Sequence, residues 1–256
     1  MDVLVCVKRV PATGGTIPLT ADGRDVDTRS LGFTIGPHEE CAVEEAARIV
    51  ERFGGSAAVL TVGPPQADEQ LRYAMSIGLQ QGVRVTTGEE ETDPEATAAA
   101  IVDAVRTLES ETRPFDLILF GNESADAGNC QVGIRVAHAL ARPAVGGIKG
   151  IEPQPEHGTV RLRRELPDGI EVYAAPLPAV AAVREGLNLP RYPAVTGRLR
   201  AKRAHIRTIE PELVPGGLRK VRLRPPAEAA RETVVLGHGA AAAGPVVDML
   251  AELGMV

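Results

Sequence analysis

The sequence predicts an α/β protein built on a doubly wound, mainly parallel sheet. Apolar runs without alternation, at residues 3–7, 57–62 and 115–120, are typical of strands covered on both faces. Segments with helical periodicity alternate with these runs, and the connections are long enough for right-handed crossovers. We expect an antiparallel hairpin and an extended C-terminal arm to complete the fold.

The first strand, residues 3–7, leads into a loop over residues 11–35 that is rich in glycine and proline. A helix then begins at Pro37, and Gly36 can serve as its N-cap. A glycine pair at positions 54 and 55 ends this helix. Its apolar positions recur at helical spacing and are Val43, Ala46, Ala47 and Val50.

Four acidic residues belong to the same helix: Glu39, Glu40, Glu44 and Glu45. Acids in the first turns of a helix complement the positive end of its dipole. We therefore predict that they form a solvated helix face.

The following elements continue the alternation of strands and helices. They are a strand at 57–62, a helix at 67–77, a short strand at 83–85, a helix at 95–108 and a strand at 115–120. Gly63 ends the first of these strands, Gly78 caps the first helix and Asp93 caps the second. A further helix is predicted to start near Cys130.

The pattern changes after residue 143. Residues 159–165 and 170–174 alternate in polarity around a Pro-Asp-Gly turn, which predicts a hairpin, and residues 177–183 form another buried strand. We assign residues 1–192 to a nucleotide-binding α/β domain.

The remaining residues, 193–256, are predicted to form a basic C-terminal arm. Residues 198–224 hold nine Lys or Arg against two Glu. Only residues 232–236 and 245–253 have the patterns of a last strand and helix. The arm either contacts a partner through its positive charge or is a solvated tail.

Composition limits the classes of function. The 256 residues carry a formal net charge of −6, which argues against a nucleic-acid partner because binding to a phosphate backbone depends on Lys and Arg. No apolar segment approaches the roughly 20 residues that span a bilayer, and no signal peptide is recognisable at the start. Cys6, Cys41 and Cys130 fit neither a disulfide framework nor a metal site. We therefore expect a cytoplasmic protein.

The loop over residues 121–133 is the main candidate for a ligand site. It follows a strand and precedes a helix, and in an open parallel sheet ligands bind beyond the carboxyl ends of the strands. The strand ends near Val5 and Gly63 are expected at the same rim, where backbone N–H groups can surround a nucleotide. Asp126 or Gln131 would then reach its ribose or phosphate. The alternative is an ordinary βα turn without a ligand.

No constellation of catalytic residues accompanies this rim. The sequence lacks a GxGxxG, P-loop, HExxH or GxSxG motif. Cys130 at a helix start is either a thiol of lowered pKa or, as we favour, a small buried residue. No residue is identified as a general acid or base, so whether the chain is an enzyme stays open.

Five segments of the chain carry motifs in one order. They are residues 4–10, 36–46, 61–78, 121–133 and 164–192. The second is similar to the pattern Asn-Pro-x-Asp-Glu-x-Ala-Val-Glu-Glu-Ala, and the last contains Leu-Asn-Leu-Pro-Arg-Tyr at 187–192. Together they resemble the beta subunit of electron transfer flavoproteins, including the nitrogen-fixation-associated type, from Val3 to about Lys202.

The resemblance implies an adenine-nucleotide-hydrolase-like fold and a heterodimer with an alpha subunit that holds most of the FAD. It also implies AMP at the rim of this chain and transfer of electrons from flavin dehydrogenases to an acceptor. Glu165 would contact the FAD domain of the alpha subunit, and Leu187 would anchor the dehydrogenases. By position, the residues around AMP would be Cys6, Gly36, Pro37, Val62, Gly63, Gly121, Asp126, Cys130, Gln131 and Val132.

Some positions depart from the family pattern. Gly36 replaces the usual Asn, which removes a side-chain hydrogen bond, and His38 follows the proline. The tail runs past the family's usual basic end and is interpreted as an arm that clasps the alpha subunit. Two alternatives stay open: a flavin-bifurcating member with a second FAD in the AMP crevice, and a stand-alone adenine-nucleotide-binding domain.

Overall fold

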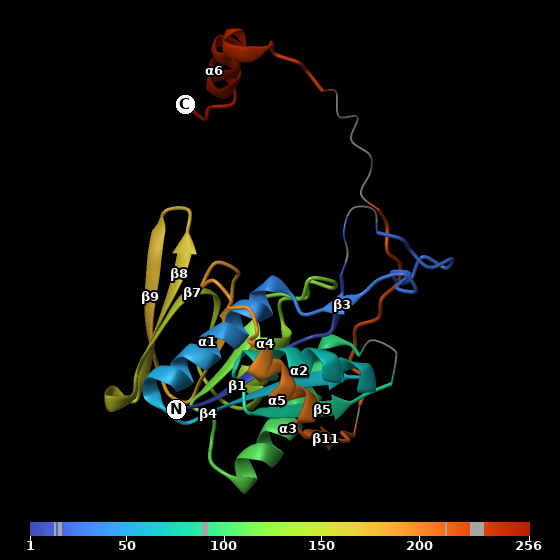
Figure 1. The fold of residues 1–256 in the computed structure, drawn as a ribbon, viewed down its shortest axis with the longest axis vertical. Coiled ribbons are helices and arrows are strands. Elements are labelled where there is room, and N and C mark those ends of the chain that lie inside the picture. Colours follow the sequence, from blue (N-terminus) through green and yellow to red (C-terminus); the bar gives the residue numbers. More distant parts are fainter. Residues whose placement is uncertain (13, 15–16, 89–91, 213, 226–232) are drawn as a thin grey trace. The chain divides into compact units, whose positions relative to one another are not determined.

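A computed structural model describes residues 1–12, 14, 17–88, 92–212, 214–225 and 233–256 of the chain (Figure 1). The strands are β1 (Asp2–Cys6), β2 (Val10–Pro11), β3 (Phe33–Thr34), β4 (Ser56–Gly63), β5 (Gln81–Thr86), β6 (Leu117–Gly121), β7 (Ala144–Gln154), β8 (Thr159–Leu166), β9 (Gly169–Pro176), β10 (Ala179–Val183) and β11 (Ile206–Ile209). The α-helices are α1 (Pro37–Phe53), α2 (Asp68–Ile77), α3 (Pro94–Glu111), α4 (Val132–Ala139), α5 (Val195–Arg203) and α6 (Ala243–Glu252). Short 3-10 helices are η1 (Pro65–Ala67), η2 (Pro155–His157) and η3 (Gly239–Ala242).

The main sheet has nine strands in the order β11-β5-β4-β1-β6-β10-β7-β8-β9. From β11 to β7 all neighbours are parallel, whereas β7, β8 and β9 are antiparallel. The hairpin of β8 and β9 extends this end of the sheet past the helices (Figure 1, yellow). The predicted fold class, a mainly parallel α/β sheet with an added hairpin, is therefore confirmed.

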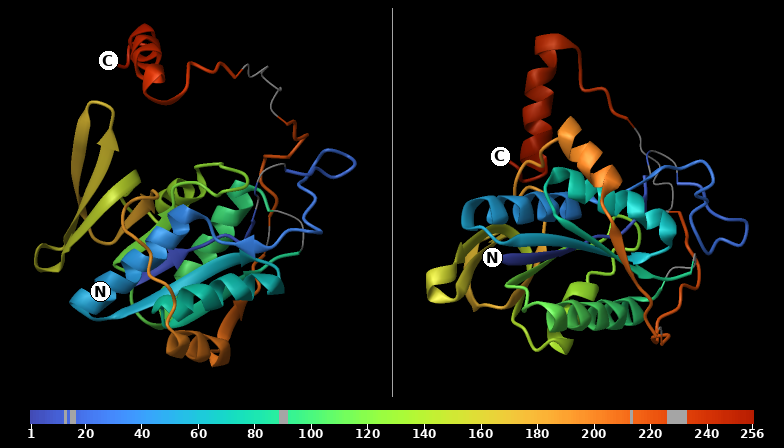
Figure 2. Two further views of the ribbon diagram at one scale, coloured as in Figure 1. Left: turned by 45° about the horizontal axis from the view of Figure 1, so that its top comes forward. Right: turned by 60° about the horizontal axis from the view of Figure 1, so that its bottom comes forward.

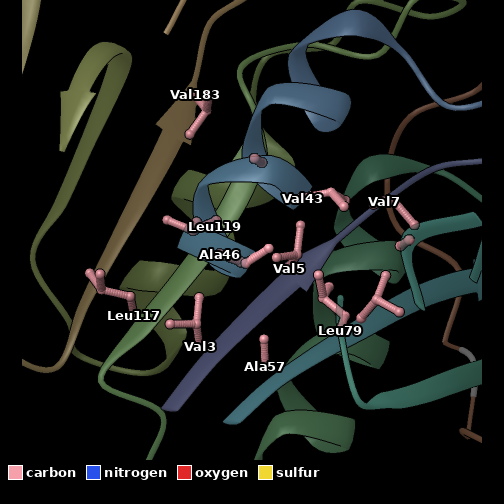
Figure 3. Close-up of a cluster of buried hydrophobic side chains, with 14 of the residues drawn as sticks. Val3, Val5, Val7, Val43, Ala46, Ala57, Leu79, Leu117, Leu119 and Val183 are labelled. Carbon is pink, nitrogen blue, oxygen red and sulfur yellow. The ribbon is translucent and has the colours of Figure 1, made fainter. Parts of the chain in front are cut away.

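Helices cover both faces of the parallel strands (Figure 2, right). The side chains of Val3 and Val5 point to the face covered by α1 and α2, whereas Leu4 and Cys6 point to the face covered by α3 and α4. Figure 3 shows the first of these cores, where Val43 and Ala46 of α1 lie over the central strands. Burial on both faces explains why these strands have no polar alternation.

Three elements of the sheet region were not predicted: β7, α5 and β11. The apolar pattern of β7 is interrupted by glycines and charged residues, and most of its residues are only partly buried or exposed. The helix α5 packs on α2, and the close approach requires Gly197, where a Cβ atom would collide with the carbonyl oxygen of Ser76. The tertiary contacts of α5 and β11 therefore outweigh their weak local signals.

The chain divides into two units, Met1–Arg222 and Leu223–Val256. The first unit extends beyond the predicted boundary at residue 192, because β11 pairs in parallel with β5 and completes an edge of the sheet. The prediction of a strand at 232–236 is wrong for the residues that the structure describes. Residues 233–236 form no strand, and Glu232 lies outside the described residues. No described strand pairs with this segment, and an isolated strand has little stability of its own.

Candidate functional site: the rim of strands β4, β1 and β6

The ends of three central strands meet at one rim of the sheet. β1 lies between β4 and β6, and Cys6 is in register with Leu60 on one side and Phe120 on the other. Gly63 and Gly121 therefore end strands that adjoin Cys6. The convergence of strand ends predicted from the sequence is present in the structure.

The N-terminus of α1 lies against the same rim. Gly36 is its N-cap, and a Cβ atom there would collide with Oε2 of Glu39. A Cβ atom at Gly121 would lie 2.9 Å from Cγ of Glu39 and 3.2 Å from Cβ of His38. Glycine at position 121 therefore lets the first turn of α1 pack closely on the end of β6, and glycine at position 36 leaves room for the Glu39 carboxyl beside the N-cap. Pro37, the first residue of the helix, is exposed beside Gly36.

Asp126 ties the loop after β6 to the end of β1. Its carboxylate accepts a hydrogen bond from Nζ of Lys8, with an N–O distance of 2.7 Å to the nearer oxygen. Burial raises the pKa of Asp126, but the attraction of Lys8 outweighs it and holds the pKa below its usual value. Asp126 is therefore an ionised acceptor at the rim.

Cys130 differs from both sequence interpretations. It is exposed, and its backbone has a φ of 55°, a value that residues other than glycine rarely adopt. Its Sγ donates to a carboxylate oxygen of Glu123 at 3.2 Å, and this hydrogen bond raises the pKa of the thiol. The prediction of a small buried residue is therefore wrong, and the thiol is not activated either.

The other predicted rim residues have mainly packing contacts in this structure. Val62 and Val132 are half-buried against the core beneath α3 and α4. Cys6 is buried, which raises the pKa of its thiol. The carboxamide oxygen of Gln131 accepts a hydrogen bond from Nε of Arg135 at 2.9 Å.

Glu39 is a rim residue that the sequence analysis placed on a solvated face. Its side chain is only 4% exposed, and Oε2 has no hydrogen-bond partner among the described residues. Burial raises the pKa of this carboxyl to about 7. A signal existed in the sequence, because Glu39 precedes Val43 by four residues and so shares its buried helix face.

Glu44 is likewise buried, at 1% exposed, and it holds the loop after β10. One of its oxygens accepts from the backbone N–H and Nε of Arg191, at 3.1 and 2.8 Å. Arg191 also binds Glu51, and the amide of Asn188 donates to the Cys41 carbonyl. Helix α1 therefore contacts the rim with its first turn and supports the loop along its length.

The two predicted docking residues lie outside the rim. Glu165, on the exposed hairpin, accepts a hydrogen bond from Nζ of Lys149 at 2.9 Å. Leu187 is half-buried against the core beneath α1, whereas Leu189 is 84% exposed and Tyr192 is 94% exposed. The loop therefore presents apolar side chains on both sides of Arg191, whose guanidinium contacts the buried carboxylate of Glu44.

Three further observations on the described residues concern a second cavity, metal binding and membrane-spanning helices. A cavity of about 250 Å³ lies between α2 and α5, lined by Arg72, Tyr73 and Arg198 among others, and contains no predicted site residue. Within the described ranges, no three His, Cys, Asp or Glu side chains are grouped to hold a metal. No helix among those residues is long and apolar enough to cross a membrane.

The fold and its rim define the doubly wound α/β class, in which strand ends and helix N-termini face one edge of the sheet. Residues 25–214 match the model of the electron transfer flavoprotein domain, so the chain belongs to the electron transfer flavoprotein family. It is a beta subunit and an electron carrier of that family, which implies an alpha partner.

Several known proteins are similar to this chain over most of their own length. The electron transfer flavoprotein subunit beta of Bacillus subtilis is 32% identical over 82% of this chain and 79% of its own. Protein FixA of Bradyrhizobium diazoefficiens is 31% identical over 80% of this chain and 72% of its own. The acryloyl-CoA reductase electron transfer subunit gamma of Anaerotignum propionicum is 30% identical over 77% of this chain and 73% of its own.

Proposed function

We propose that this beta subunit binds AMP at the rim of β4, β1 and β6 and shares FAD with its alpha subunit. The observation that supports this proposal is membership of the electron transfer flavoprotein family, whose beta subunits are electron carriers. This role needs no catalytic acid or base, and the sequence shows no constellation of such residues. FAD supplies the redox chemistry when it is bound, and the protein supplies binding and orientation. The local sequence pattern of residues 121–133 alone is compatible both with a nucleotide site and with an ordinary βα turn.

The chemistry of the rim residues fits an adenine nucleotide. The ionised carboxylate of Asp126 can accept hydrogen bonds from ribose hydroxyls, and Oε2 of Glu39 is a buried acceptor without a partner among the described residues. The N-terminus of α4, which has no acid in its first turn, begins at Val132 beside Gln131 and Cys130. Backbone N–H groups of this kind bind phosphate. These residues come from separate segments that the fold brings to one edge.

We further propose that flavin dehydrogenases dock on the loop after β10 and that the alpha subunit contacts Glu165. Nζ of Lys149 binds Glu165 and would lie 3.8 Å from a Cβ atom at Gly186, so the hairpin and the loop adjoin. The loop also carries the exposed apolar residues Leu189 and Tyr192. The C-terminal arm is proposed to hold the alpha subunit.

The cofactor content of the heterodimer tests the nucleotide proposal. The chain is co-expressed with its alpha subunit, purified and denatured, and the released nucleotides are separated and quantified. One FAD and one AMP per heterodimer are expected. Release of no adenine nucleotide other than one FAD would contradict AMP binding at the rim.

One second candidate is the flavin-bifurcating arrangement that the sequence analysis left open, and the motif Gly-Pro-Pro-Gln-Ala at residues 63–67 motivates it. A second FAD would then occupy the rim in place of AMP. The same measurement separates the two proposals, because two FAD per heterodimer support the second and exclude the first.

A further inference from the structure

His38 lies between the loop after β6 and the loop after β10. It is the second residue of α1, and its Cβ atom would lie 3.2 Å from a Cβ atom added at Gly121, where β6 ends. Its side chain is only 14% exposed. One ring nitrogen faces each loop, so the imidazole links two segments that are separated along the chain by β7, β8, β9 and β10.

The hydrogen bond to the loop after β10 determines which ring nitrogen carries the proton. Nδ1 of His38 accepts a hydrogen bond from the backbone N–H of Glu185 at 2.8 Å. A ring nitrogen that accepts a hydrogen bond has no proton, so the proton of this neutral imidazole is on Nε2. Nε2 lies 3.6 Å from Oε1 of Glu123. The attraction between this N–H and the carboxylate holds the ring in the orientation that the bond from Glu185 requires.

Glu123 extends these contacts to the rim. Its second carboxylate oxygen, Oε2, accepts a hydrogen bond from Sγ of Cys130 at 3.2 Å. Cys130 is one of the predicted nucleotide-binding residues, and it belongs to the same loop as Asp126. A continuous series of side-chain contacts therefore connects Cys130, through Glu123 and His38, to the backbone of Glu185.

The loop between β6 and α4 is the part of this series that a nucleotide would order. Residues 122–130 are mostly exposed. A segment with few buried contacts opens locally at a low cost in free energy. A nucleotide that contacts Asp126 would restrict this loop, and the side chains attached to the loop would lose freedom with it. His38 is attached to the loop through Glu123.

We propose that His38 is a positioning residue that couples nucleotide binding at the rim to the order of the loop after β10. With the rim occupied, the loop between β6 and α4 holds Glu123, whose carboxylate orients His38, and Nδ1 then holds the backbone of Glu185. The loop after β10 is the proposed docking surface, so the nucleotide acts on that surface without contacting a dehydrogenase. This inference rests on the proposed binding of AMP.

The test measures hydrogen exchange of the Glu185 amide in the heterodimer freed of its rim nucleotide, with and without saturating AMP. Mass spectrometry of overlapping peptides isolates this amide. AMP should slow its exchange about fivefold or more, since couplings between sites are typically of at least that size. In Glu123→Ala the exchange rate should be the same with and without AMP. His157→Ala is the matched control, since it removes an exposed imidazole on η2, and it should keep the full effect.

Two substitutions at His38 separate coupling from simple support of the loop. Asparagine carries an amide oxygen close to the position of Nδ1, so His38→Asn should keep the slow exchange of the Glu185 amide in the absence of AMP. Its shorter side chain does not extend to Glu123, so AMP should have no further effect. His38→Ala should exchange faster even without AMP. If His38 only supported the loop, His38→Asn would respond to AMP as the unmodified protein does.

A calorimetric titration with AMP accompanies each exchange measurement. Two results would overturn the inference while leaving AMP binding intact: an unchanged Glu185 exchange rate when AMP binds the unmodified protein, or a full response to AMP in Glu123→Ala. Absence of AMP binding to the unmodified heterodimer would instead refute the proposed function, and the inference with it. Melting curves establish that each variant is folded before its exchange is measured.

Discussion

At the scale of single residues, the loop after β10 separates an apolar side chain that packs from one that is free to contact a partner. Leu187 lies against the core beneath α1, and Leu189, two residues later, is 84% exposed. The family resemblance pointed to Leu187 alone. Burial shows that substitutions at the two positions test different properties.

Leu189→Ala is expected to leave the free energy of unfolding unchanged and to weaken docking of a flavin dehydrogenase. An exposed apolar anchor at an interface contributes about 2 kcal/mol, or roughly 30-fold in affinity. The measurement is the dependence of FAD reduction rate on heterodimer concentration with the dehydrogenase as donor. An unchanged dependence would show that Leu189 is not in the interface.

Leu187→Ala serves as the matched variant. Because Leu187 is half-buried, its truncation should cost about 2 kcal/mol of unfolding free energy, measured by urea denaturation. A variant that keeps full stability but loses dehydrogenase coupling would instead identify Leu187 as an anchor that is exposed in solution.

At the scale of elements, α1 joins the two regions that we propose to be functional, the rim and the loop after β10. Its first turn packs on Gly121 at the rim, and Nδ1 of His38 accepts a hydrogen bond from the backbone N–H of Glu185 at 2.8 Å. Further along, Glu44 and Glu51 bind Arg191. The loop is thus attached to the same helix at its beginning and near its end.

Glu44→Gln is expected to destabilise the subunit by about 2 kcal/mol at neutral pH, less than a fully buried pair because Arg191 is partly solvated. Burial raises the pKa of Glu44, but the hydrogen bonds from Arg191 and Arg48 outweigh it, and its pKa is lowered. A lowered pKa stabilises the folded state above the unfolded value of about 4.3, and this contribution is lost as pH falls through the folded value.

The difference in stability between Glu44→Gln and the unmodified chain should therefore shrink between about pH 5 and about pH 3. Urea denaturation at several pH values measures it. Glu51→Gln is the control, since Glu51 is 58% exposed and its exposed ion pair should contribute less than about 1 kcal/mol. A constant difference across this pH range would exclude ionised Glu44 as the support of the loop.

The elements also show what the sequence could predict. Strong local patterns predicted the strands β1, β4 and β6 and the helices α1 and α3. The convergence of the three strand ends at one rim followed from the topology of a parallel sheet. The burial of Glu44 did not follow, because its ion-pair partner Arg191 lies far along the chain. For Glu39 the sequence offered only its position on the helix face of Val43, since its close contact with Gly121 also comes from a distant segment. Likewise β11 is a strand only because the edge of β5 is available to it.

At the scale of the whole molecule, the division at Arg222 separates residues that complete the sheet from those that do not. The second unit contains η3 and α6, and the residues of α6 that could form a core are exposed: Val246, Val247 and Met249. A helix of this length is marginally stable without tertiary packing. We therefore expect α6 to have its apolar side covered by the alpha subunit.

A chain that ends at Arg222 should keep the Tm of the first unit, because α5 and β11 are retained, but should bind the alpha subunit at least about tenfold more weakly. A chain that ends at Tyr192 is the contrasting variant: it removes the pairing of β11 with β5 and the packing of α5 on α2, so its Tm should fall. Analytical ultracentrifugation measures the association, and thermal unfolding measures Tm. If the chain ending at Arg222 bound the alpha subunit with full affinity, the second unit would be a solvated tail and the arm proposal would be wrong.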